Sequence, residues 1–201
     1  MNDVEKKRIK GVLKYTWPLY IVSAIVIVFG MNFIFGITHR LPAYKSLTLF
    51  ISGEVKDDKK LRNNLLDKYQ QNELKSVSII SAKPAETQYF TKLTVAGYNS
   101  ADILIIPLSK LENLNVSAFS IELEESLIND YYQGYDFYNQ ESINYGIKVD
   151  KTKVQEYMTL PEEECYMFLN GKSQNIGEYG VKPNKEHSNA LNVVKDWGSN
   201  V

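Results

Sequence analysis

The sequence contains very little cysteine and histidine: Cys165 is its only cysteine, and His39 and His187 are its only histidines. A lone cysteine excludes an internal disulfide, so the domain must be stabilised by its core. So few thiols and imidazoles argue against a four-ligand zinc site. Because an acylated lipoprotein anchor needs a cysteine directly after the apolar run and the only cysteine is Cys165, that kind of anchor is also excluded. We predict no cofactor and no metal.

The chain has no excess of positive charge. It carries 23 Lys and Arg against 24 Asp and Glu, for a net charge of −1, and the basic residues of its larger part form no cluster. Affinity for a phosphate backbone depends on clustered Lys and Arg. We therefore predict that nucleic acid is not a partner.

Recognisable catalytic motifs are also missing. The sequence has no G-x-S-x-G elbow, and the G-K-S at Gly171 to Ser173 lacks the earlier glycine of a phosphate-binding loop, because Tyr166 occupies that position. The acidic run 162–164 lacks the alternating oxygen ligands and the glycine turn of a calcium loop. The sequence therefore predicts a protein that is not an enzyme.

One long apolar run is present near the N-terminus. From Tyr15 to Ile37 the chain has 23 residues without a charge, and about 20 apolar residues suffice to cross a bilayer core of roughly 30 Å. Trp17 and Tyr20 suit a membrane interface, and Pro18 suits a first helical turn. We predict a transmembrane helix over 15–38. A cleaved signal peptide is the alternative, but the run is long for one and no small-x-small cleavage site follows it.

The flanking charges predict the orientation of this helix. Five basic residues precede the run and only Arg40 and Lys45 follow it closely; positive charge favours the cytoplasmic side. We therefore expect a cytoplasmic tail over 1–14, a linker over 39–45 and an extracytoplasmic domain over 46–201. The predicted location is the cell membrane, and the lipid bilayer is a predicted partner through the single span.

Strands and helices are predicted to alternate beyond the linker. Apolar β-rich runs indicate strands at 46–52, 77–80 and 102–106, with helices between them marked by Leu61 and Leu65 and by Tyr89 and Leu93. Further elements are a helix around 123–131, strands near 145–149 and 165–169, and a last helix capped by Asn184 that includes His187 in its first turn and stops at Gly198. Alternation of this kind predicts an α/β fold with a three-layer, open and mainly parallel sheet.

Three segments carry a family resemblance: SADILIIPL at 100–108, NYGIKV at 144–149 and YMFLNGKSQNIGEYG at 166–180. With the preceding strand-helix order, they resemble extracellular solute-binding proteins of bacterial transporters over Ser46 to Gly198. The resemblance implies a periplasmic-binding-protein-like single lobe on a membrane anchor, at a cell surface or in a periplasm. Because a complete binding protein is about twice as long and has a second lobe, it implies a truncated relative with a transporter as its partner.

Two groups of residues are candidates for a ligand-binding surface. Ser52, Glu54 and Ser109 follow strands whose carboxyl ends meet at one sheet edge, where open α/β sheets bind ligands. Tyr131, Tyr132 and Tyr135 belong to an aromatic cluster suited to stacking on a sugar or covering a protein partner. The alternatives are that Gly53 and Pro107 only end their strands, and that the tyrosines pack in the core and cap a helix.

Two functions follow from these observations. The first is a membrane-anchored, extracytoplasmic accessory or interaction domain without enzymatic activity, associated with a transporter. The second is a membrane-tethered receptor for a small ligand (a sugar, a peptide or an ion) that it delivers to a permease; tethering raises the effective concentration of such a receptor to about the millimolar range.

Overall fold

The computed structural model describes residues 3–38, 41–180 and 183–200. It divides into two compact units, Met1–Leu41 and Pro42–Val201. The side chains of the first unit are described only between Gly11 and Asn32, with gaps, and at Leu41. Residues 1–2 of the predicted tail and residues 39–40 of the predicted linker therefore lie outside the described residues.

The first unit consists of one long helix, α1 (Asp3–Thr38), with Pro18 inside it. Among the described residues, no helix meets both the length and the hydropathy that crossing a membrane demands. The predicted transmembrane span is therefore not confirmed and stays a prediction.

The second unit is an α/β domain in which strands and helices alternate at first, as predicted. The strands are β1 (Ser46–Ile51), β2 (Glu54–Val55), β3 (Ser76–Ser81), β4 (Ile103–Pro107), β5 (Phe137–Gln140), β6 (Ile143–Lys148), β7 (Met158–Thr159) and β8 (Cys165–Leu169). The helices are α2 (Asp58–Lys68), α3 (Tyr89–Lys92), α4 (Tyr98–Ser100), α5 (Leu108–Leu111), α6 (Glu125–Tyr131), α7 (Lys151–Val154) and α8 (Asn189–Trp197).

The main sheet is mixed and has the strand order β3-β1-β4-β8-β6-β5. Strand β1 pairs in parallel with both β3 and β4, whereas the β4–β8, β8–β6 and β6–β5 pairs are antiparallel. The predicted parallel arrangement is therefore confirmed for one half of the sheet and is wrong for the other. Strand β8 enters beside β4 from the opposite direction because the chain after α7 returns along the sheet without a crossover helix.

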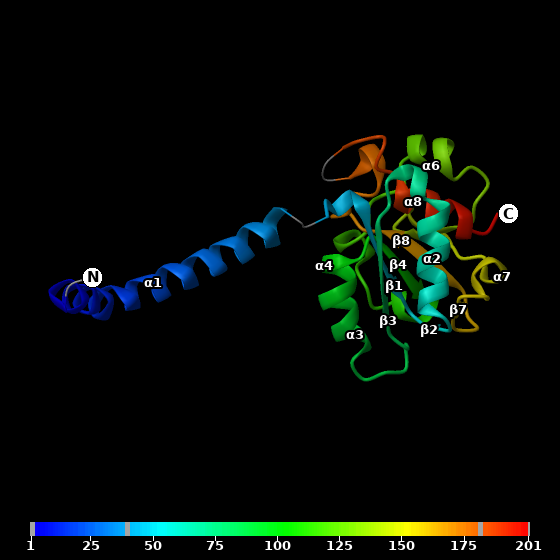
Figure 1. The fold of residues 1–201 in the computed structure, drawn as a ribbon. Helices are drawn as coiled ribbons and strands as arrows, with labels where there is room; N and C mark the ends of the chain where they lie inside the picture. Colours follow the sequence, from blue (N-terminus) through cyan, green and yellow to red (C-terminus); the bar gives the residue numbers. More distant parts are fainter. Residues whose placement is uncertain (1–2, 39–40, 181–182, 201) are drawn as a thin grey trace. The chain divides into compact units, whose positions relative to one another are not determined.

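Two apolar layers cover the two faces of this sheet, as the three-layer prediction requires. Leu47, Leu49 and Ile51 of β1 pack with α2, α6 and α8 on one face, while Phe50 packs with Tyr89 and the α3 region on the other. Figure 1 shows α2 and α3 on opposite sides of the sheet. This alternation along β1 follows from the two-residue period of a strand.

Two local predictions need correction. The last helix begins at Asn189 after Ser188, so Asn184 does not cap it and His187 precedes it; the backbone N–H of His187 instead donates to the carbonyl of Asn184 in a turn. The helix after Pro84 is interrupted by a π-helical turn, η3 (Leu93–Gly97), between α3 and α4. Residues Phe137–Gln140, after the predicted tyrosines, form the edge strand β5, in which Tyr138 contacts Tyr166 and Phe168 of β8.

Candidate functional site

Ser52 lies at the carboxyl edge of the parallel strands, as predicted. Its N–H donates to the carbonyl of Ile105 at 3.0 Å, which holds the end of β1 beside β4. The residue is completely buried, and its Oγ is 2.7 Å from Oη of Tyr89. The hydroxyl is therefore engaged inside the protein and is not presented to a ligand.

Glu54 and Ser109 lie near the same edge and also have partners within the chain. The carboxylate of Glu54 is 2.7 Å from Nζ of Lys83, and this hydrogen bond lowers the pKa of Glu54. The N–H and Oγ of Ser109 both donate to the Glu163 carboxylate at 2.7 Å. The predicted edge residues thus serve mainly to fasten neighbouring loops to one another.

The predicted tyrosines lie beside α8. Tyr132 is completely buried and its hydroxyl donates to the carbonyl of Leu191 at 3.1 Å. The hydroxyl of Tyr135 donates to the carbonyl of Lys195 at 2.8 Å. These two residues support the core-packing alternative, whereas Tyr131 is only half-buried, with Nζ of Lys195 6.0 Å from its ring centroid.

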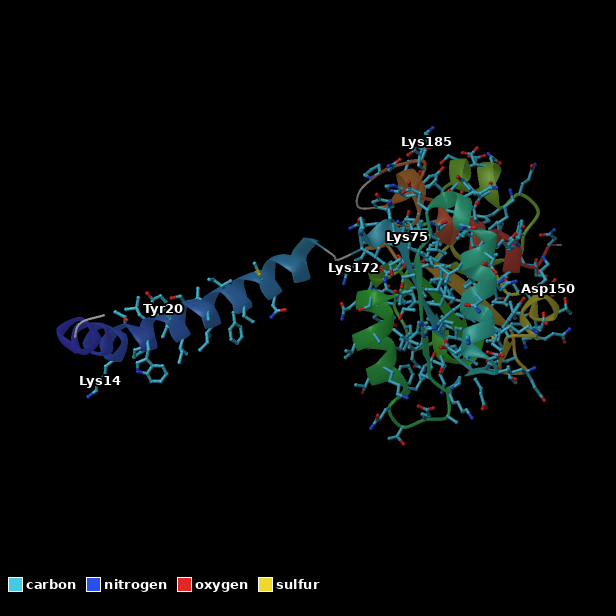
Figure 2. All side chains as sticks on the ribbon, viewed as in Figure 1. Lys14, Tyr20, Lys75, Asp150, Lys172 and Lys185 are labelled. Atoms are coloured by element: carbon cyan, nitrogen blue, oxygen red, sulfur yellow. The ribbon has the colours of Figure 1, made fainter. Side chains whose placement is uncertain are left out.

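Tyr131 lines a pocket of about 400 Å³ together with Tyr179 and the carboxylates of Asp130 and Glu178. Lys185, labelled in Figure 2, also lines it and lies 3.3 Å from the Glu178 carboxylate. Aromatic rings flanked by charged groups can stack on an apolar face of a ligand while hydrogen bonding to its polar groups. Of the six predicted site residues, Tyr131 is the one that lines this pocket.

A second polar pocket lies at the opposite, amino edge of the sheet and was missed in the sequence. It has a volume of about 260 Å³ and is lined by Ser46 and Thr48 of β1, by Asn99 to Asp102, and by Asn170, Lys172, Ser173 and Gln174. Antiparallel pairing of β8 with β4 places the end of β8 beside the start of β4. The sequence does contain one signal of this pocket: polar residues stand directly before the buried strand β4 and directly after the buried strand β8.

Asp102 is the buried charged group of this amino-edge pocket. Its Oδ1 accepts hydrogen bonds from Ser173 Oγ at 2.5 Å and Asn175 Nδ2 at 3.2 Å, and its Oδ2 accepts one from the Thr48 N–H at 2.7 Å. Burial raises the pKa of this carboxyl above its ordinary value, and the three donors oppose the rise. The carboxylate joins β1, β4 and the loop after β8.

The described residues do not gather a metal site or an activated nucleophile. No group of three or more His, Cys, Asp or Glu side chains in this part of the chain is placed to hold a metal ion. Cys165 is buried, and burial raises the pKa of its thiol to about 11. A thiol with so high a pKa carries almost no thiolate at neutral pH and is a poor nucleophile.

Comparison with known proteins gives one structural similarity. No family model matches the chain, and no curated protein matches it by sequence. The solved ABC substrate-binding protein Lmo0181 from Listeria monocytogenes, in complex with cycloalternan, aligns with a TM-score of 0.32 and 17% identity. The alignment covers 55% of this chain and 32% of that protein. The chain thus spans about a third of that protein's length.

Proposed function

We propose that this chain is a membrane-anchored, non-enzymatic interaction module, with α1 in the bilayer and the α/β domain on the extracytoplasmic side. The observation that carries the anchor is the exposure of α1: eleven large apolar side chains between Trp17 and Met31 are exposed. In the described part of the domain only Phe90, Val95 and Leu108 are comparably exposed. Contiguous exposed apolar surface of this size is typical of a membrane or protein contact.

The exposed apolar side chains of α1 would provide a substantial driving force for insertion. Full burial of one large apolar side chain contributes roughly 1.5–3 kcal/mol, so eleven partly exposed ones contribute on the order of 10 kcal/mol or more. The basic residues before the apolar run favour a cytoplasmic N-terminus. This arrangement supports an extracytoplasmic location for the domain.

The domain itself is better suited to contact with a protein partner, such as a transporter, than to catalysis. The polar atoms of Ser52 and Ser109 are occupied by neighbouring side chains. Phe90 and Val95 instead expose 44% and 64% of their surface on α3 and the following turn, and Nζ of Lys110 lies 5.7 Å from the Phe90 ring centroid. An apolar surface beside a cation suits a protein interface.

The anchor is tested with the full chain in isolated membranes. We expect it to resist alkaline carbonate extraction, and the double variant Ile25→Asp, Val26→Asp to move to the soluble fraction because charges within a span are costly. Val95→Asp is the matched control and should stay in the membrane fraction. Release of the unchanged chain by carbonate would refute anchoring.

The partner is tested by site-specific photo-crosslinking in intact cells. A crosslinker at position 95 should capture a discrete membrane protein, whereas the same group at position 63, an exposed site on α2, should not. Equal capture from both positions would mean that the contact is not specific to the Phe90 and Val95 surface.

The pocket beside Tyr131 favours the second candidate function, a tethered receptor for a small ligand. A panel of sugars, peptides and divalent ions should then contain a compound that raises the thermal midpoint of the full chain. Ligand at 100 times its dissociation constant adds about 2.7 kcal/mol. Tyr131→Ala should abolish that shift and Tyr135→Phe should preserve it; no shift with any compound favours the interaction module.

A further inference from the structure

The amino-edge pocket presents polar groups that the fold leaves unused. Ser46, Thr48 and Ser100 line it, and among the described residues none of these three side-chain hydroxyls has a hydrogen-bond partner. At about 260 Å³ the pocket is smaller than the roughly 300–1,000 Å³ of a site for a drug-sized ligand. Its size and lining therefore suit a small ligand with several hydrogen-bonding groups.

Lys172 supplies the accessible charge of this pocket. Its Nζ donates to Oδ1 of Asn99 at 3.1 Å, and it forms no ion pair with any carboxylate in the described part of the chain. Figure 2 labels this residue on the α/β domain. An ammonium group bonded to a neutral amide retains its full charge and two further donors for an anion.

Asp102 limits how much negative charge the pocket can accept. Its carboxylate already receives three hydrogen bonds from the protein, so it needs no partner from the ligand. A second anionic group near it would be repelled. A ligand must therefore place a single acidic group at Lys172 and neutral groups along β1.

We propose that the amino-edge pocket binds a small ligand with one acidic group and neighbouring hydroxyls, of the glycerol phosphate type. The acidic group lies against Lys172 and Asn99, and the hydroxyls face Ser46, Thr48 and Ser100. Ala43, a few residues after α1 in the sequence, also lines the pocket. The same chemistry can come from a soluble metabolite or from the headgroup of a phosphatidylglycerol lipid; only the lipid source rests on the proposed anchoring.

The test uses the full chain in nanodiscs of phosphatidylcholine, titrated calorimetrically with glycerol phosphate, glycerol and inorganic phosphate. Glycerol phosphate should bind more tightly than either fragment, and Lys172→Met should weaken it at least tenfold. Lys75→Met is the matched control because Lys75 is exposed at the amino end of β3 and does not line the pocket. Its affinity should stay within twofold.

A second arm compares these discs with discs that contain phosphatidylglycerol, using amide hydrogen exchange of residues 170–175. Binding of the free compound identifies a soluble ligand when discs that contain phosphatidylglycerol give residues 170–175 no added protection. Protection that needs both phosphatidylglycerol and Lys172 identifies the lipid. Neither effect, or an equal loss in Lys75→Met, overturns the proposal. Failure of the chain to enter discs would refute the proposed anchoring but not the proposed ligand site, because the titration can still be made in detergent.

Discussion

Oγ of Ser52 and Oη of Tyr89 lie 2.7 Å apart in the interior of the domain. The contact joins the end of β1 to α3, and both residues are almost entirely buried. Burial raises the pKa of Tyr89 to about 12, so the phenol stays protonated at ordinary pH. The pair is a closed internal contact at the edge where ligands usually bind in such sheets.

This pair gives the first prediction. Ser52→Ala and Tyr89→Phe should each lower the free energy of unfolding by about 1–3 kcal/mol, because each leaves a buried hydroxyl without its partner. The double variant should lose less than the sum, since it removes both hydroxyls together. Urea unfolding of the four proteins measures the coupling. Strictly additive losses would show that the two groups do not interact.

Asp102 predicts a dependence of stability on pH. Because burial raises its folded-state pKa, the folded protein holds this proton more tightly than the unfolded chain does. The resulting stabilisation is present below the unfolded pKa and is lost as the pH rises through the folded pKa, with a slope of at most about 1.4 kcal/mol per pH unit. The stability difference between wild type and Asp102→Asn should therefore shrink as the pH rises. A pH-independent difference in denaturant titrations would contradict this.

Gly146 should not tolerate a side chain. A Cβ at this position would lie 2.6 Å from the Phe168 ring, and the ring is buried between neighbouring aromatic residues. Overpacking of this kind costs about 1–3 kcal/mol, so Gly146→Ala should lower the thermal midpoint. Gly171→Ala is the control, because its Cβ would approach no atom closer than 3.7 Å. Equal midpoints for the two variants would refute the clash.

The side chain of Lys151 should hold the acidic loop at residues 161–164, before β8, in one conformation. Its Nζ donates to the carbonyls of Pro161, Glu162 and Glu163 at 2.6 Å each. Lys151→Met leaves three carbonyls without this donor, and charge-assisted hydrogen bonds contribute about 1.5–3 kcal/mol each at most. Amide exchange of residues 161–164 should accelerate in this variant but not in Lys59→Met, whose side chain is exposed. Unchanged exchange would mean that the loop is held by other contacts.

Much of the domain could be predicted because its apolar pattern is strong. The run at 165–169 forms β8, and the helix marked by Leu61 and Leu65 is α2. The direction of β8 could not be predicted, because a fully buried strand has the same apolar pattern in parallel and antiparallel pairing. The mixed sheet follows from chain connectivity that no local pattern encodes.

The candidate site was predicted less well for a related reason. Ser52 and Ser109 were placed at the correct sheet edge, but their partners Tyr89 and Glu163 are distant in sequence. The amino-edge pocket depends on the β4–β8 pairing, which brings residue 102 beside residues 170–175. The sequence pattern identifies polar residues at the ends of strands, but it does not show which of these residues meet in the fold.

The chain enters the α/β domain through β1, which is hydrogen bonded to β3 on one side and to β4 on the other. A pull on the segment before Ser46 therefore acts along a central strand held on both flanks. Such a load must shear two ladders of bonds at once instead of peeling an edge strand away one bond at a time. The first strand of the domain is therefore held on both sides, unlike the edge strands β3 and β5.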